Sequence, residues 1–220
     1  MQRPLRIALE GNIGVGKSTL LQDLPRHLQG GTWEARVEKA DEDPEFVRLL
    51  NEFYINPNKR VELQSWITNS RTKELVDLDA STNYVFERSF IGDMIFCYAN
   101  FLKHERPTGD HLGVLYDAMD QGRAFPLDAV VYLEASPKAC MKRINMRSRE
   151  SEDGIPEDYI TYLHNCYETH MPEIAKQFNI PIIHVDWNEF HSTDYIARKI
   201  HMTLNIKTDT NNQVQYLKAL

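Results

Sequence analysis

The feature that most constrains the fold is a glycine-rich string near the start of the chain. Residues 11–19 read GNIGVGKST and match the pattern GxxxxGK[ST] in full. The string follows a short apolar run at residues 5–10 and precedes leucines at helical spacing in residues 18–28, so it joins a predicted buried strand to a predicted helix. The backbone N–H groups of such a loop turn inward, and with the positive end of the helix they bind phosphate groups. The sequence therefore predicts a nucleotide-binding loop.

Within this loop two side chains carry chemistry. Lys17 is placed to bridge the terminal phosphates of a triphosphate, and the Ser18 hydroxyl is placed to ligate Mg²⁺. The pattern does not decide what becomes of the γ-phosphate, because GTPase switches, motor ATPases and small-molecule kinases all contain it. No Asn-Lys-x-Asp string that would read guanine occurs in the sequence, which disfavours a switch GTPase. The candidate ATP-binding residues of the loop are Gly11, Asn12, Ile13, Gly14, Val15, Gly16, Lys17, Ser18 and Thr19.

Strand-like and helix-like segments alternate along the rest of the chain. Parallel neighbours in a sheet need long crossover connections, which helices usually supply, so this order predicts an α/β fold whose five-stranded parallel sheet is covered by helices on both faces. We expect one domain over residues 1–206 and a polar tail over residues 207–220. The predicted strands are residues 5–10, 35–40, 83–87, 129–134 and 180–185, and the predicted helices are residues 18–28, 44–54, 61–78, 93–104, 137–147, 156–178 and 194–205.

Composition limits the class of partner. The chain has 25 basic and 32 acidic side chains and a formal charge of −7, so it offers no general attraction to nucleic acid or to an anionic membrane. No apolar stretch reaches the roughly 20 residues that span a bilayer. The three cysteines, Cys97, Cys140 and Cys166, lack the spacing of a zinc site or a disulfide scaffold. We expect a cytoplasmic protein with no nucleic-acid or membrane partner.

Several segments together resemble the deoxyribonucleoside kinase family, over about residues 5–204. They are the loop at residues 11–19, the triplet Glu87-Arg88-Ser89, and residues 143–156, which read RINMRSRESEDGIP. The resemblance implies a P-loop kinase fold with a helical lid at about residues 143–156. It also implies an enzyme, commonly a homodimer, that uses Mg²⁺ and transfers the γ-phosphate of ATP to the 5′-hydroxyl of a deoxynucleoside.

Catalytic candidates follow two of the predicted strands. A phosphoryl acceptor needs a carboxylate base within hydrogen-bond reach, and Glu38 lies where a strand beside the phosphate loop ends, with Glu42 as its competitor. The resemblance assigns Glu87 to Mg²⁺ and Arg88 to the transferring phosphoryl group. A buried structural ion pair is the alternative for Glu87 and Arg88.

A second group of candidates concerns the closing of the ATP site. Arg143, Arg147 and Arg149 occur within seven residues and resemble the family's lid arginines, although a solvated basic helix face is the alternative. Glu189 and Phe190 resemble the loop that contacts the ATP adenine.

The acceptor pocket is predicted from the register of five residues. Gln64 offers a donor and an acceptor on one amide, which suits pairing with a base edge, and Arg71 follows two helical turns later. Asp93 matches the family aspartate that pairs with this arginine, while Tyr54 and Glu152 match residues that hold the 3′-hydroxyl of deoxyribose. The arginine and aspartate pair resembles the deoxycytidine and purine deoxynucleoside kinases more than the thymidine-preferring ones, and this resemblance implies deoxyadenosine as the acceptor, with deoxyguanosine or deoxycytidine as secondary acceptors.

Two other functions fit a phosphate loop of this kind. A nucleoside monophosphate kinase has a similar fold but needs further basic residues for the phosphate of its acceptor. A nucleotide-gated binding protein would use the loop for conformational control without an acceptor.

Overall fold

The computed structural model describes residues 3–38, 42–101, 108–147 and 154–207, without the side chains of Tyr54 and Pro57. The elements of these residues, in chain order, are β1 (Arg6–Glu10), α1 (Lys17–Leu21), α2 (Leu24–His27), β2 (Trp33–Arg36), α3 (Pro44–Ile55), the short 3-10 helix η2 (Pro57–Lys59), α4 (Arg60–Val76), β3 (Asn83–Glu87), α5 (Phe90–Phe101), α6 (Gly109–Ala124), β4 (Ala129–Glu134), α7 (Pro137–Arg147), α8 (Glu157–Gln177), β5 (Ile182–Asp186) and α9 (Thr193–Leu204).

The strands form one five-stranded sheet in the order β2-β3-β1-β4-β5, and every neighbouring pair is parallel. The predicted parallel sheet is therefore confirmed. Because all strands run the same way, their carboxyl ends meet along one edge, and the loops after β1, β2 and β3 lie side by side there. The register aligns Leu9 with Glu87 and Glu10 with Tyr132 across this edge.

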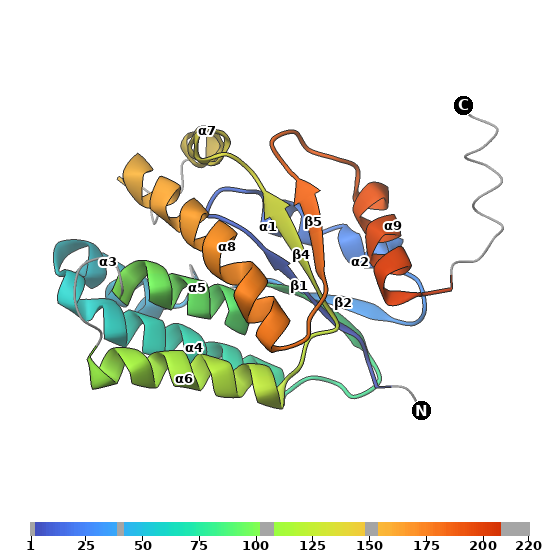
Figure 1. Cartoon of the computed structure of the whole chain (residues 1–220), viewed down its shortest axis with the longest axis horizontal. Coiled ribbons are helices and arrows are strands. Elements are labelled where there is room, and N and C mark those ends of the chain that lie inside the picture. Colours follow the sequence, from blue (N-terminus) through green and yellow to red (C-terminus); the bar gives the residue numbers. More distant parts are fainter. Residues whose placement is uncertain (1–2, 39–41, 102–107, 148–153, 208–220) are drawn as a thin grey trace.

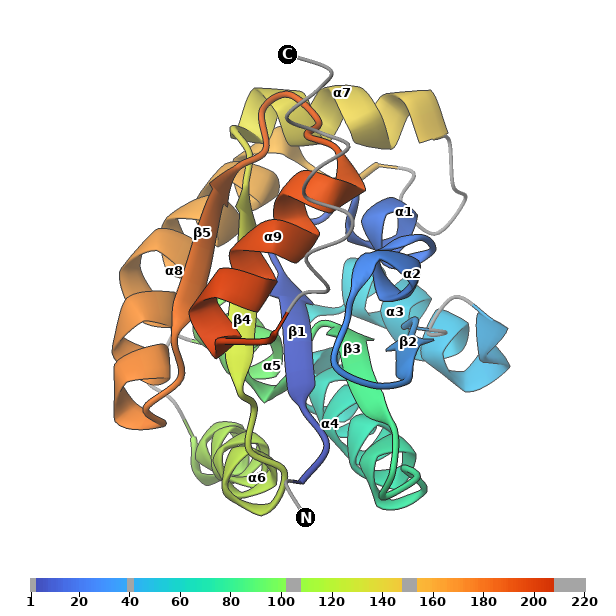
Figure 2. The same ribbon diagram turned by 90° about the vertical axis from the view of Figure 1, so that its right-hand side faces the viewer.

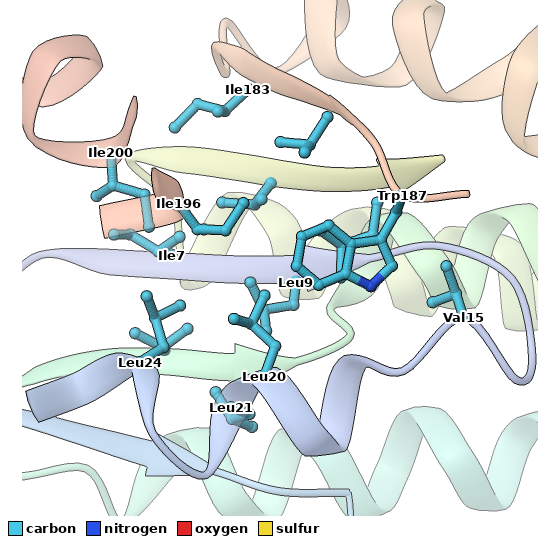
Figure 3. Packing of buried hydrophobic residues seen from close by; sticks show 14 of the residues in the cluster. Ile7, Leu9, Val15, Leu20, Leu21, Leu24, Ile183, Trp187, Ile196 and Ile200 are labelled. Atoms are coloured by element: carbon cyan, nitrogen blue, oxygen red, sulfur yellow. The ribbon is translucent and has the colours of Figure 1, made fainter. Parts of the chain in front are cut away.

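Helices cover both faces of the sheet (Figure 1 and Figure 2). Helices α1, α2 and α9 pack on one face, and α4, α5, α6 and α8 cover the other. This arrangement explains why β1 and β4 read as continuous apolar runs, since Ile7, Ala8 and Leu9 are all fully buried. Figure 3 shows side chains from β1, α1, α2, β5 and α9 meeting in the core of the first face.

Local sequence signals set several helix ends. Helix α3 begins where the Asp43 carboxylate accepts hydrogen bonds from two backbone N–H groups, followed by Pro44 at the first helical position. Helix α9 is tied to α2 by His27, whose ring nitrogens lie 2.6 Å from Asp194 Oδ1 and 2.9 Å from Asp23 Oδ2.

Among the described residues, no helix has the length and apolar character required to cross a bilayer.

The structure corrects three element predictions. Strand β2 runs over Trp33–Arg36 instead of residues 35–40, because its pairing with β3 starts at Trp33 and the chain leaves the sheet edge at Val37. The predicted helix at residues 18–28 is two short helices, α1 and α2, with Pro25 in the first turn of the second. Helix α6 is absent from the predicted elements, although Thr108 and His111 cap its start.

Candidate active site

The phosphate loop leaves β1 at the carboxyl edge of the sheet and turns back against α7. Gly14 has a φ of 76°, and a Cβ atom there would lie 2.6 Å from Ile144 Cγ1 and 2.8 Å from the Cys140 carbonyl oxygen. Only glycine fits this position, because α7 packs directly on the loop and the backbone is left-handed. The Asn12 side chain fixes the other side of the loop by donating a 2.9 Å hydrogen bond to the Ile160 carbonyl in α8.

Lys17 is buried and folds back over its own loop. Its Nζ atom donates to the carbonyl oxygens of Gly11, at 3.1 Å, and Asn12, at 3.0 Å. Burial and the nearby positive charge of Arg88 lower the pKa of Lys17 to about 7. A polyphosphate beside the ammonium group would raise this pKa again. The charged form of Lys17 is therefore most stable when an anionic ligand is bound in the loop.

Ser18 and Glu87 bring two hard oxygen donors together from different elements. The Ser18 hydroxyl, in α1, donates a 2.6 Å hydrogen bond to Glu87 Oε1 at the end of β3. The backbone N–H of Glu38 donates to the second carboxylate oxygen of Glu87 at 3.3 Å. A hydroxyl and a carboxylate are donors that Mg²⁺ prefers, so these two residues fit a magnesium site beside Lys17.

Arg88 takes a strained backbone conformation directly after β3. Its φ is 66°, a region that non-glycine residues enter rarely and at a cost of order 1–3 kcal/mol. The guanidinium is held from two sides, since Nη1 donates to the Gly11 carbonyl at 3.1 Å and to the Tyr167 hydroxyl at 2.9 Å. It also lies 4.8 Å from the centre of the Phe96 ring. The strained backbone and these contacts together place the Arg88 guanidinium at the phosphate loop.

Glu38 lies between two arginines. Its carboxylate oxygens are 3.2 Å from Arg88 Nε and 3.3 Å from Arg71 Nη2, and its side chain is 28% exposed. Burial alone would raise the pKa of Glu38, but Arg88, Arg71 and Lys17 together hold the pKa below its usual value. Glu38 is thus a carboxylate at neutral pH, able to accept a hydrogen bond from a hydroxyl group.

Arg71 and Asp93 form a buried bidentate ion pair between α4 and α5. Nε donates to Asp93 Oδ2 at 2.8 Å, and Nη2 donates to Oδ1 at 3.0 Å. Despite the cost of burial, Asp93 and Glu38 raise the pKa of Arg71. Gln64, two helical turns before Arg71 on α4, is buried with its Nε2 atom 3.5 Å from the backbone carbonyl of Asp93. These groups make a rigid polar wall next to Glu38.

One cavity of about 280 Å³ contains most of these groups. Its opposite lining is apolar and comes from α3, α4 and α5, including Phe46, Phe53 and Phe96. A cavity with aromatic walls and a few converging polar groups is typical of a small-molecule site. The predicted residues that line it are Gly14, Gly16, Lys17, Ser18, Glu38, Gln64, Glu87, Arg88, Asp93 and Arg147, together with Ile13 and the competitor Glu42.

A family model described as deoxynucleoside kinase matches residues 7–207 of the chain. The chain belongs to the deoxynucleoside kinase family. It is 27% identical over 204 residues to a deoxyguanosine kinase of Dictyostelium discoideum, covering 89% of this chain and 68% of that protein. It is 30% identical over 220 residues to deoxycytidine kinase 1 of Xenopus laevis, covering 84% of this chain and 82% of that protein.

A solved structure of a deoxyadenosine kinase from M. mycoides with bound dCTP is also similar. Its TM-score is 0.71 and its identity 26%, and the match covers 91% of this chain and 99% of that one. The prediction of an ATP-dependent phosphotransferase of the deoxynucleoside kinase family, with a P-loop kinase fold, is confirmed. The relatives are named for different deoxynucleosides, so the family alone does not select the acceptor.

In this kinase, the predicted residues Arg143 and Phe190 lie against the phosphate loop, outside the lining of the cavity. Arg143 donates through Nη1 to the Val15 carbonyl at 3.2 Å and through Nη2 to the Trp187 carbonyl at 2.8 Å. Its guanidinium lies 4.2 Å from the centre of the Phe190 ring, so Arg143 joins the phosphate loop to the loop after β5. Phe190 is 62% exposed and borders Gly16. Arg149, Glu152 and the side chain of Tyr54 lie outside the described residues.

Sequence reasoning missed one buried acid behind the site and two polar residues in the lining of the cavity. Glu10 is fully buried, accepts a 2.7 Å hydrogen bond from the Ser89 hydroxyl and a 3.2 Å bond from Tyr167, and burial raises its pKa. Asn100 and Tyr159 line the cavity and lie within 3.1 Å of each other. A signal existed only for Glu10, because a charged residue at the end of an otherwise buried strand needs specific partners.

Proposed function

We propose that this deoxynucleoside kinase transfers the γ-phosphoryl group of ATP to the 5′-hydroxyl of deoxyadenosine in preference to other deoxynucleosides. The observation that carries the proposal is the shared cavity, in which Glu38, Gln64 and Arg88 face one space together with Lys17. An acceptor bound against Gln64 has its sugar directed toward Glu38, next to the phosphate loop. Deoxyguanosine and deoxycytidine are proposed as secondary acceptors.

In the proposed mechanism Glu38 accepts the proton of the 5′-hydroxyl as that oxygen attacks the γ-phosphorus in line. Its lowered pKa keeps the carboxylate ionised at neutral pH, in the form that can accept a proton, and Arg71 and Arg88 hold it in place. Lys17 and Arg88 stabilise charge on the phosphoryl oxygens by fixed positive groups in a largely buried site. Mg²⁺ held by Ser18 and Glu87 would neutralise the phosphates.

The base preference is proposed from the amide of Gln64 and the buried Arg71–Asp93 pair. An amide pairs in a bidentate manner with a donor and an acceptor on neighbouring atoms of adenine. Because the ion pair is locked by two hydrogen bonds, the donors and acceptors beside Gln64 are preorganised. The M. mycoides relative is named a deoxyadenosine kinase, which supports this choice, and it has been solved both with bound dATP and with bound dCTP.

The remaining roles are proposed from the family resemblance. Arg143, Arg147 and Arg149 close the ATP site, and the loop with Glu189 and Phe190 contacts the adenine of ATP. Tyr54 and Glu152 hold the 3′-hydroxyl. The active form is proposed to be a homodimer, and light scattering of the purified chain tests its mass.

The test is ADP formation with each of the four deoxynucleosides at saturating ATP. The proposal expects the highest kcat/KM for deoxyadenosine. Equal or greater kcat/KM for thymidine would overturn the preference while leaving the kinase activity intact. Turnover that requires a nucleoside monophosphate, or that needs no acceptor, would overturn the assignment of a nucleoside hydroxyl as the acceptor.

A further inference from the structure

We propose that Glu134, His164 and Glu168 form a binding site for a divalent transition-metal ion of the Zn²⁺ class. The ligand atoms that these three side chains offer all lie within 4.8 Å of one another. Glu134 ends β4, and His164 and Glu168 occupy adjacent turns on one face of α8, which runs beside β4 (Figure 1). None of the three lines the nucleotide cavity. The site is therefore distinct from the pair of Ser18 and Glu87.

The ligand set selects the class of metal. One imidazole nitrogen and two carboxylate oxygens are ligands of Zn²⁺ and related transition metals, whereas Mg²⁺ takes oxygen ligands in octahedral geometry. A tetrahedral ion with bonds of about 2.0–2.1 Å holds its ligand atoms roughly 3.3 Å apart. The three ligand atoms, all within 4.8 Å of one another, would have to approach to that separation when the ion binds. Glu134 and His164 are partly buried and Glu168 is exposed, so an ion reaches the site from solvent.

Both carboxylates already have partners that orient them. His184 Nε2, on the edge strand β5, lies 2.6 Å from Glu134 Oε2. The Tyr132 hydroxyl donates a 2.5 Å hydrogen bond to Glu168 Oε1. The Tyr132 ring is stacked on His184, with ring centres 5.3 Å apart, which fixes both partners. Metal ligands in proteins are commonly held in this way by a second layer of hydrogen bonds.

The charges of Glu134 and Glu168 favour binding of a cation. Two carboxylates brought this close repel each other, and a divalent ion between them removes that repulsion more completely than a neighbouring imidazole does. The ion would also tie the end of β4 to α8. Tyr132 stacks on Tyr167 of the same helix, with ring centres 5.8 Å apart, so this tie lies directly behind the residue that holds Arg88.

The experiment is Zn²⁺ titration of the full chain by calorimetry, after chelator treatment, without nucleotide and with excess Mg²⁺ to occupy sites made of oxygen ligands. We expect one Zn²⁺ per chain in the wild type. His164→Gln and Glu168→Gln should each weaken binding by about tenfold or more. The matched controls are His170→Gln and Glu173→Gln on the same helix, which should bind as the wild type does. Glu168→Gln keeps an acceptor for Tyr132 and concerns an exposed side chain, so it tests the site even if His164→Gln fails to fold.

Thermal unfolding gives a second measurement. At Zn²⁺ concentrations of about 100 times Kd, the wild type should gain roughly 5–10 °C in Tm, and Glu168→Gln should gain much less at the same concentration. Binding that is equally strong in Glu168→Gln and in the control variants would overturn the proposal. Failure of the wild type to bind Zn²⁺ at micromolar concentration would overturn it as well.

Discussion

Replacing Asp93 by asparagine should destabilise the fold far more than a similar change at the surface. Asp93 and Arg71 have side chains only 3% and 8% exposed and share two hydrogen bonds. Removing one partner of a buried ion pair typically costs about 3–5 kcal/mol, because the other charge stays buried. Glu38, 3.3 Å from Arg71, offsets part of this loss. We therefore expect a cost near the lower limit, about 3 kcal/mol, for Asp93→Asn.

The assay is equilibrium unfolding in urea, supported by thermal unfolding. For a chain of this length about 3 kcal/mol corresponds to a loss of roughly 6–12 °C in Tm. The control is Asp120→Asn, because Asp120 pairs with Arg123 where both side chains are more than half exposed, and the expected cost is below about 1 kcal/mol. The double variant Arg71→Met/Asp93→Leu should be more stable than Asp93→Asn. Equal costs for Asp93→Asn and Asp120→Asn would refute the reasoning.

Three further predictions concern other parts of the molecule. Burial lowers the pKa of His27, but hydrogen bonds to its two aspartate partners outweigh burial, so the net pKa lies above its usual value. The stability lost in His27→Gln should therefore be largest below about pH 6.5 and vanish as the pH rises through the higher folded-state pKa. Urea unfolding at a series of pH values measures this loss. Tyr167→Phe removes a hydroxyl that binds Arg88, so steady-state kinetics should show kcat reduced roughly tenfold with little change in the deoxynucleoside KM. Gly113→Ala, in α6 with open space around the added methyl group, should raise the unfolding free energy by about 0.5–1 kcal/mol, as urea unfolding measures.

The parallel sheet could be predicted because the sequence signals for its strands are local. Strands β1 and β4 are apolar throughout most of their length, and the glycine string determines the loop that leaves β1. Helix α6 could not be found in this way, because its apolar residues do not lie on one buried face: Val114 and Ala118 are buried, whereas Leu112 and Tyr116 are exposed. The predicted position of β2 is wrong because an edge strand has one neighbour, and its pairing with β3 determines where it starts.

The same contrast between local signals and long-range contacts applies to the site residues. Lys17, Glu87 and Arg88 follow strands whose ends could be located, so their meeting at one edge of the sheet could be predicted. The strain at Arg88 and the partners of the buried Glu10 could not, since both depend on contacts between segments far apart in sequence. Glu10 and Tyr167 are 157 residues apart, and only the packing of α8 on the sheet brings them together.

The most direct test of the mechanism compares Glu38→Gln with Glu42→Gln. Both carboxylates line the cavity, but only Glu38 is held by Arg71 and Arg88 beside the phosphate loop. For the Glu38→Gln variant we expect kcat to fall by about 10²–10⁴ while calorimetry shows nearly unchanged deoxynucleoside affinity, and for Glu42→Gln we expect kcat close to that of the wild type. Full kcat in Glu38→Gln, or a comparable loss in Glu42→Gln, would contradict the account.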